Sequence, residues 1–249
     1  MKKRAISIFV MMSFMISLCT PISFASSYPK VRGNDTWLNK HWCIRAPYSA
    51  SDGEVQILYF DGIGNHGDRR GSLNIGGYNT IYYVGKFNGR YYFNVCDSLG
   101  FVSRGLYSIK PGSGKFKRAA RGINTASISK KGLISKRYVF AYSYMHDKDW
   151  FGKAYVFDLK KNRKLSLGEI YSKKKVGNKL YYVKKDGSNG KVSLKLYRTN
   201  GKRTKLVKTY TTEAAADYCV YDIKLTEKQL KYTYRGPADE VVTVSRKYR

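Results

Sequence analysis

The sequence predicts an all-β protein built from a repeated four-stranded unit, and two observations support this prediction. An apolar residue followed by tyrosine opens a strand at four positions, and the tyrosines are 48, 48 and 42 residues apart: Tyr59, Tyr107, Tyr155 and Tyr197. A strand rich in aromatic residues precedes each step, and no segment shows the 3.6-residue period of a helix. A repeat of about 45 residues is typical of a β-propeller blade. We therefore expect a β-propeller of about five four-stranded blades, with a β-sandwich of irregular hairpins as the alternative.

Each unit consists of strand A, a turn, strand B, a loop, strand C, a turn and strand D. Strand B is the aromatic strand, which we expect at residues 41–44, 90–93, 137–140, 179–182 and 230–232. Strand A precedes it, as at 81–84 and 170–171. Turns containing glycine follow strand C, as at 110–115 and 199–202. The fifth unit ends near its strand C, so we expect residues 28–32 to add the missing outer strand and close the ring.

The N-terminal segment has the pattern of an export signal. Three basic residues at positions 2–4 precede an apolar stretch over 6–18, and 23–25 supplies the small residues that a signal peptidase needs. We expect residues 1–25 to be a signal peptide and residues 26–249 to form a single propeller domain. The mature protein is then secreted and extracellular, with wall association as a further expectation.

Two other interpretations of this segment remain open. A transmembrane anchor requires a longer apolar run than this one, which ends before Pro21. A lipoprotein would be anchored at Cys19, but Leu18 stands where lipid attachment requires a small side chain. No later segment is apolar enough to span a bilayer.

The mature chain retains an odd number of cysteines, Cys43, Cys96 and Cys219. Export makes disulfide bonds possible, and their spacing fits no zinc-binding pattern. We interpret the three as small buried hydrophobic residues and leave one disulfide bridge open. The sequence gives no reason to expect a metal or a cofactor.

Three segments resemble the repeats of known bacterial proteins: LYSIKPGSGKFK at 106–117, AYVFDLKKNRKL at 154–165 and GNKLYYVKKD at 177–186. They are similar to the repeats of secreted TolB-like propellers and of propellers in families of unknown function. The resemblance is strongest over residues 80–235. It implies a ring-shaped binding scaffold and brings no catalytic residues with it.

Basic residues dominate the composition and are concentrated in particular turns. The chain has 47 Lys and Arg against 17 Asp and Glu, a net charge of +30, which becomes +27 without the three basic residues of the signal peptide. In a propeller the A–B and C–D turns lie on one face, so the basic residues of these turns share that face, and Lys179 and Arg198 are among them. We expect ten residues of these turns to bind ligand: Lys160, Lys161, Arg163, Lys164, Lys173, Lys174, Lys175, Lys202, Arg203 and Lys205.

A strong one-sided positive field favours a polyanionic partner. For an exported protein we expect an anionic polymer of the cell envelope or an acidic polysaccharide. Nucleic acid is less expected, because the tyrosines are needed for packing between blades and are not available for stacking on bases. A protein partner is a further alternative, and so is a purely solubilising role for the lysines.

Eight of the seventeen acidic residues fall in the predicted B–C loops. One of these loops combines His146, Asp147, Asp149 and Trp150, which could hold a cation or a sugar. An alternative function is therefore a glycosidase-like enzyme using carboxylates of these loops and nearby strand ends. The candidates are Asp97, Asp147, Asp149, Asp217 and Asp222. No acid recurs across the units, so we assign no catalytic residue and favour a non-catalytic protein.

Overall fold

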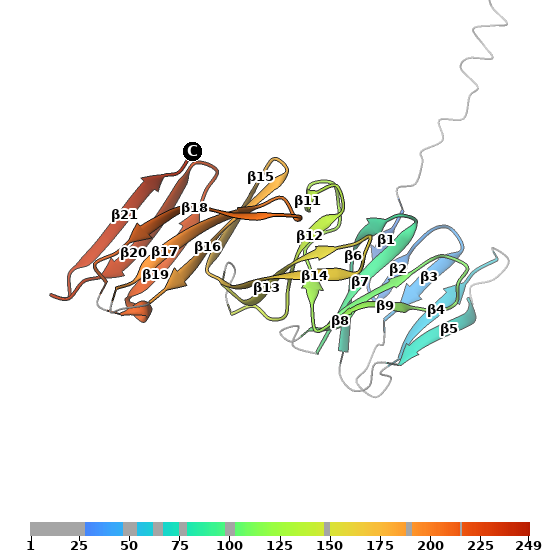
Figure 1. Ribbon diagram of the computed structural model, residues 1–249. Helices are drawn as coiled ribbons and strands as arrows, with labels where there is room; N and C mark the ends of the chain where they lie inside the picture. The colour runs from blue at the N-terminus through green and yellow to red at the C-terminus, as the bar shows by residue number, and fades with distance from the viewer. Residues whose placement is uncertain are drawn as a thin grey trace, which may run out of the picture.

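The computed structural model describes residues 28–46, 54–61, 67–74, 79–97, 103–146, 150–187, 191–214 and 216–249, with backbone only for residues 79, 97 and 217. The predicted signal peptide lies outside the described residues. The described residues form an all-β fold, with 21 strands in five antiparallel sheets (Figure 1). The one helical segment among the described residues is a single 3-10 turn, Asp217–Cys219. None of the described residues forms a helix long and apolar enough to cross a membrane.

Each sheet is formed by strands that are consecutive in the sequence. Sheet 1 contains β1 (Lys30–Arg32), β2 (Asp35–Trp37), β3 (Trp42–Arg45), β4 (Glu54–Tyr59) and β5 (Asp68–Asn74). Sheet 2 contains β6 (Asn79–Phe87), β7 (Arg90–Asp97), β8 (Ser103–Ile109) and β9 (Lys117–Arg121). Sheet 3 contains β10 (Asn124–Thr125), β11 (Leu133–Ser135), β12 (Tyr138–Tyr142), β13 (Phe151–Asp158) and β14 (Arg163–Ile170).

Sheet 4 contains β15 (Ser172–Val176), β16 (Lys179–Asp186), β17 (Ser193–Thr199) and β18 (Thr204–Thr211), and sheet 5 contains β19 (Val220–Leu225), β20 (Gln229–Arg235) and β21 (Val241–Lys247). The predicted unit of four antiparallel strands is confirmed in sheets 2 and 4, and the fifth unit ends after strand C as expected. Sheet 1 has one additional strand, and strand A of sheet 3 is split into β10 and β11.

The hairpin turns follow from their sequences. Asn88 and Gly89, between β6 and β7, both have positive φ, 48° and 70°. Asn-Gly tolerates this conformation, which matches the twist of a two-residue hairpin. Strand A of the fourth unit differs from the prediction, because Ile170 is the last residue of β14 and β15 begins at Ser172.

Four hydrophobic clusters join consecutive sheets. One residue pair illustrates each interface: Ile57 with Phe93, Leu106 with Phe157, Val156 with Tyr182, and Leu196 with Tyr232. Buried tyrosines such as Tyr92 and Tyr182 lie in these clusters, so their predicted role in packing between sheets is confirmed. The sheets therefore stack face to face in chain order.

Buried polar contacts fix the relative position of neighbouring sheets. Asn94 of sheet 2 donates to the carbonyl of Thr125 in sheet 3 and accepts from its backbone N–H, both at 2.9 Å. The backbone N–H of Leu225 in sheet 5 donates to the Ser172 hydroxyl of sheet 4 at 3.0 Å. Breaking such a bond leaves a buried polar group unsatisfied, so these contacts select one packing arrangement.

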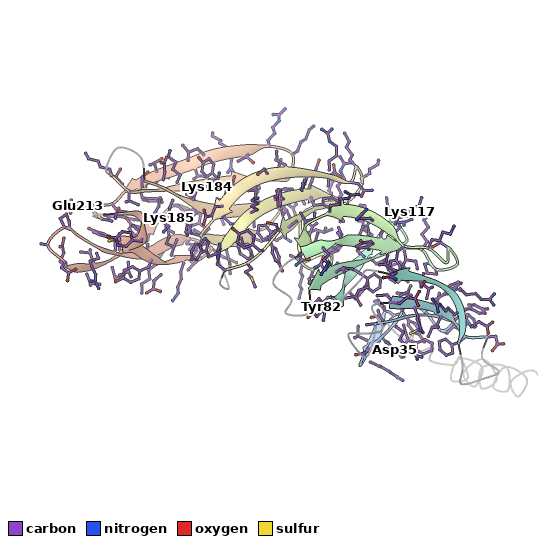
Figure 2. The ribbon with its side chains drawn as sticks, turned by 90° about the horizontal axis from the view of Figure 1, so that it is seen from below. Asp35, Tyr82, Lys117, Lys184, Lys185 and Glu213 are labelled. Atoms are coloured by element: carbon purple, nitrogen blue, oxygen red, sulfur yellow. The ribbon has the colours of Figure 1, made fainter. Side chains whose placement is uncertain are left out.

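The expected closure by residues 28–32 is wrong. This segment forms β1, which pairs with β2 through Val31 and Thr36. No hydrophobic cluster of the described residues joins sheet 1 to sheet 5, and two views show them at opposite ends of a row (Figures 1 and 2). The side of sheet 5 that faces away from sheet 4 carries exposed Lys224 and Lys231. The sheets thus form an open stack with a polar final face.

All three described cysteines are buried and none forms a disulfide bond, which agrees with their interpretation as small buried hydrophobic residues. No disulfide links Cys43, Cys96 and Cys219. Burial raises the pKa of the Cys43 thiol to about 12, and the Asp35 carboxylate adds to the shift.

Candidate anion-binding site

The A–B and C–D turns leave each sheet at the same edge, because consecutive strands are antiparallel neighbours. In sheet 4 the register pairs Val176 with Lys179 beside one turn and Thr199 with Thr204 beside the other. Leu180 pairs with Thr199, which aligns the two turns. We call this edge of a sheet its turn edge.

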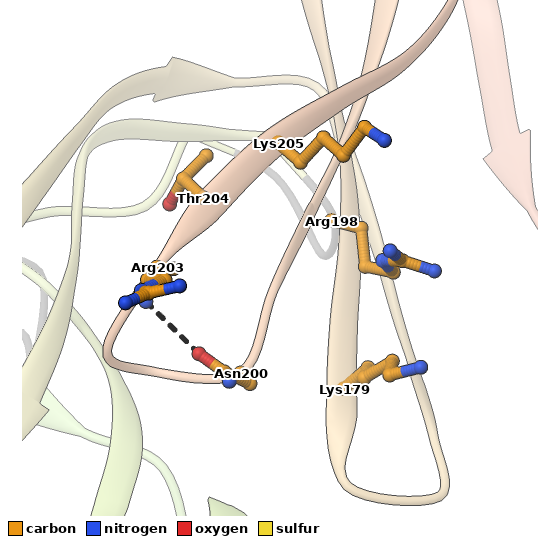
Figure 3. A pocket seen from close by; sticks show the side chains of 6 residues that line it. All are labelled: Lys179, Arg198, Asn200, Arg203, Thr204 and Lys205. Carbon is orange, nitrogen blue, oxygen red and sulfur yellow. Dashed lines mark hydrogen bonds between the residues drawn. The ribbon is translucent and has the colours of Figure 1, made fainter.

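A cavity of about 380 Å³ lies at the turn edge of sheet 4 (Figure 3). Three of its basic side chains, Lys179, Arg198 and Lys205, point to the same side of the sheet, one from each of β16, β17 and β18. The cavity is lined by four basic and two neutral polar residues and by no acidic one: Lys179, Arg198, Asn200, Arg203, Thr204 and Lys205.

The cross-strand register brings like charges together in this cavity. Arg198 on β17 lies directly opposite Lys205 on β18. Like charges at opposed positions of an antiparallel pair destabilise the sheet. An anion bound between them would remove this cost, so the arrangement suits anion binding.

Hydrogen bonds hold the β17–β18 turn in one shape. The Asn200 side-chain oxygen accepts from the backbone N–H of Lys202 at 3.0 Å. It also accepts from the backbone N–H of Arg203 at 2.9 Å (Figure 3). The Thr199 hydroxyl accepts from Gly201 N–H and donates to the carbonyl of Arg203, both at 3.0 Å. The basic side chains therefore extend from a rigid turn.

The turn edge of sheet 3 contacts the same turn. The Ser135 hydroxyl donates to the carbonyl of Asn200 at 2.6 Å. Gly201 packs against Tyr138 so closely that a β-carbon there would lie 2.2 Å from the ring. The turn edges of sheets 3 and 4 are thus in direct contact.

One acidic residue that the sequence analysis did not single out organises the turn edge of sheet 3. The Asp158 carboxylate accepts from the backbone N–H groups of Lys160 and Lys161, at 3.0 and 3.2 Å, and forms an ion pair with Arg137 at 3.0 Å. It fixes the β13–β14 turn, from which Lys160, Lys161 and Arg163 are exposed. Its pairing with Arg137 depends on the register of β12 and β13, which a single sequence does not specify.

Three of the ten predicted binding residues make local contacts. The Lys164 ammonium lies 4.8 Å from the centre of the Tyr155 ring. Lys173 is half-buried over the rings of Phe140 and Phe151, at 5.2 and 4.9 Å, so it packs between sheets 3 and 4. Lys175 donates to the carbonyl of residue 131 at 2.6 Å.

The other seven predicted residues are exposed, with Lys174 inside strand β15 and the rest at or next to the turns: Lys160, Lys161, Arg163, Lys174, Lys202, Arg203 and Lys205. The cavity adds Lys179 and Arg198, which the sequence placed on the basic face but not in the binding set. Lys179 and Arg198 line the cavity because β16, β17 and β18 are aligned at this edge of the sheet. The sequence signal that could have identified these two residues is the run of basic residues beside the turn.

The predicted ligand loop lies at the opposite edge of sheet 3. His146 and Trp150 are described, and their rings stack 4.1 Å apart. Asp147 and Asp149 lie outside the described residues.

The remaining candidate carboxylates do not assemble within the described part of the chain. The side chains of Asp97 and Asp217 are not described, and Asp222 lies exposed in strand β19. Three described acids of the B–C loops, Glu54, Asp186 and Asp239, form ion pairs within their own sheets, as in Glu54 with Arg69 at 2.5 Å. Among the described residues, no three His, Cys, Asp or Glu side chains come together as a metal site.

Comparisons with known proteins assign no family. Neither a family model nor a curated protein matches the sequence. The similar solved structures include an uncharacterized Listeria monocytogenes EGD-e protein (TM-score 0.30, 14% identity, 82% of this chain and 66% of that one). An oligogalacturonate lyase in complex with manganese has a TM-score of 0.32 at 11% identity, and the match covers 88% of this chain and 67% of that one. A Mycobacterium tuberculosis puromycin-hydrolyzing peptidase has a TM-score of 0.31 at 12% identity, and the match covers 88% of this chain and 36% of that one.

The present chain thus spans about two thirds of the length of the first two proteins and a smaller part of the third. The TM-scores are too low to establish a shared fold, and the identities are too low to transfer an activity.

Proposed function

We propose that this is a secreted, non-catalytic binding protein that holds an anionic polymer of the cell envelope, or an acidic polysaccharide, through the turn edges of sheets 3 and 4. The observation that carries the proposal is the cavity in which Arg198 opposes Lys205 with no acidic side chain in the lining. The exposed basic residues of the β13–β14 turn extend this surface and provide contacts for further units of a polymer.

We also propose that the five sheets are blades of the propeller type. Their four-stranded antiparallel units and the clusters between consecutive sheets support this part of the proposal. The role of the scaffold is to hold successive turns beside one another, so that a long polyanion meets several basic turns at once. Binding then gains from multivalency as well as from each contact.

A co-sedimentation experiment with isolated cell envelopes tests the binding function. The test variant replaces Lys202, Arg203 and Lys205 by glutamate. The matched control replaces Arg104, Arg121 and Lys191 by glutamate; these three residues are exposed at the opposite edge of sheets 2 and 4, and the change in net charge is the same.

We expect the turn variant to lose at least about tenfold in affinity and the control to lose less than about twofold, because binding depends on where the charges lie. Equal losses in both variants would show that only the net charge matters and would contradict the proposed site. Retained binding of the turn variant would contradict it as well.

A further inference from the structure

Four aromatic side chains form a continuous stack at the edge of sheet 3 opposite the basic turns. The Trp150 indole stacks on His146 at 4.1 Å and on Tyr171 at 5.5 Å, with interplanar angles of 26° and 19°. Tyr144 meets His146 edge to face at 4.8 Å. Trp150 remains 38% exposed and Tyr144 36%. Part of the aromatic surface of Trp150 and of Tyr144 is therefore in contact with solvent.

A carboxylate at the rim of this stack fixes the indole. Oε1 of Glu169 accepts a hydrogen bond from Nε1 of Trp150 at 2.6 Å and another from the Tyr171 hydroxyl at 3.0 Å. Glu169 is exposed, and no hydrogen bond from the described residues reaches its Oε2. The second oxygen can accept from a ligand while the first holds the two rings in place.

The base of the loop is closed by the backbone. His146 N–H donates to the carbonyl of Trp150 at 3.0 Å, and Met145 bridges to Phe151 at the start of β13. Tyr144 lies directly over Gly152, where a β-carbon would fall 2.1 Å from the ring. The stack is thus preorganised, which lowers the entropy cost of binding a ligand.

The chemistry of this surface selects the ligand. An anionic polymer would be repelled by the Glu169 carboxylate. A cation at the Tyr171 end of the stack would meet the Lys185 ammonium, which already lies 4.3 Å from the centre of that ring (Figure 2 labels Lys185). A partly exposed aromatic surface with a fixed hydrogen-bond acceptor at its rim matches a sugar ring, which has an apolar face of C–H groups and hydroxyl donors around it.

We propose that Trp150 and Glu169 form a second binding site, specific for a neutral pyranose unit of a glycan. The sugar ring contacts the exposed part of the indole, and its hydroxyl groups donate to Oε2 of Glu169. This site is independent of the basic turn edges, so the two edges bind chemically different parts of an envelope: a neutral glycan at one edge and an anionic polymer at the other.

Nuclear magnetic resonance of the indole N–H groups tests this site. The chain has three tryptophans, of which Trp37 and Trp42 serve as internal controls. The probes are neutral tetrasaccharides of glucose, mannose and N-acetylglucosamine at millimolar concentration. We expect one of them to shift the Trp150 indole signal saturably without moving the other two.

Two variants complete the test. Glu169→Gln should weaken this binding at least about tenfold, since it replaces the charged acceptor by a neutral amide. Trp150→Phe retains an aromatic ring and should also weaken binding of the same sugar. Circular dichroism of this variant shows whether the fold persists. The glutamate variant of the basic turn should bind the sugar normally, so failure of one site is distinguishable from failure of the other.

Three results would overturn the inference. The first is that none of the tetrasaccharides moves the Trp150 signal. The second is that Glu169→Gln binds the sugar as well as the original chain does. The third is that an anionic polymer shifts Trp150 more strongly than any neutral sugar.

Discussion

Arg198 and Lys205 lie directly opposite each other on neighbouring strands, in a cavity whose lining contains no acidic side chain. A fold selected for stability alone would place opposite charges or neutral residues at these positions. The electrostatic cost is instead retained at the edge where two sheets bring their turns together. We interpret this as a binding surface whose missing partner is an anion.

Neutralising one of the two opposed cations should separate stability from binding. We expect Arg198→Gln to raise the free energy of unfolding by about 0.2–1 kcal/mol at low salt, because the repulsion is removed. The same variant should bind anionic polymer more weakly. Urea denaturation and co-sedimentation measure the two effects. Lys117→Gln is the control, since Lys117 pairs with the neutral Ser108. A variant that is both less stable and unchanged in binding would contradict this account.

The contact between Gly201 and Tyr138 should couple the fold to the site. Gly201→Ala places a β-carbon 2.2 Å from the Tyr138 ring at a residue with a φ of 93°. We expect a loss of about 1–3 kcal/mol in stability and weaker polymer binding, because the turn must shift. Gly177→Ala is the control, with a φ of 55° and open space around it. It should cost about 1 kcal/mol and leave binding unchanged. Equal effects of the two variants would show that the packing contact is unimportant.

Asp158 should stabilise the protein even though it reduces the positive charge of the basic surface. Its side chain is only 10% exposed, and it holds the β13–β14 turn and Arg137. We expect Asp158→Ala to lower the free energy of unfolding by about 1.5–3 kcal/mol, since two backbone N–H groups of the turn lose their charged acceptor. Asp68→Ala, which breaks the exposed pair with Arg70, should cost less than about 0.5 kcal/mol. Denaturant titration that gave both variants the same stability would contradict this role.

The buried thiol of Cys43 should make stability fall at alkaline pH. Its pKa is raised from 9.0 to about 12 in the folded protein, chiefly by burial. Between these values the unfolded chain has lost the proton and the folded chain retains it. Stability is therefore complete below about pH 9 and falls at up to about 1.4 kcal/mol per pH unit above it. Burial also raises the pKa of Tyr83 and Tyr182 from 10.0 to about 12, so these side chains add to the decline from about pH 10.

Denaturation of the original chain and of Cys43→Ala across this range measures the effect. The difference in stability between the two should be constant below about pH 8 and shrink as the pH rises above about 9. A difference that stays constant throughout would show that the thiol of Cys43 ionises as readily in the folded protein as in the unfolded one.

The strand repeat could be predicted because each unit has its own local signals. Asn88 and Gly89 specify a hairpin by their backbone preferences, and the aromatic strands show where each sheet packs against the next. These features need only short stretches of sequence. The predicted ring closure failed because it depended on a contact between the two ends of the chain, for which residues 28–32 gave no specific signal.

The error at Lys173 has a similar cause. The run of lysines at 173–175 was assigned to a turn, but it lies in strand β15, which begins two residues later than expected. Side chains alternate along a strand, so Lys173 faces sheet 3 with its cross-strand partner Tyr182, and Lys174 faces the other way with Tyr181. A shift of this size decides which lysines belong to the surface. The charge of a turn is visible in the sequence, whereas the register that joins three strands into a cavity is not.

The salt dependence of binding tests the central claim most directly. Purified protein comprising residues 26–249 is titrated against cell envelopes, with and without their anionic polymers, over a range of salt concentrations. Neutralisation of several charges releases counterions, so the logarithm of the affinity should fall steeply and linearly with the logarithm of the salt concentration. We predict a steep slope that disappears when the anionic polymers are removed. A flat slope, or a slope unaffected by their removal, would show that the basic turn edges do not bind them.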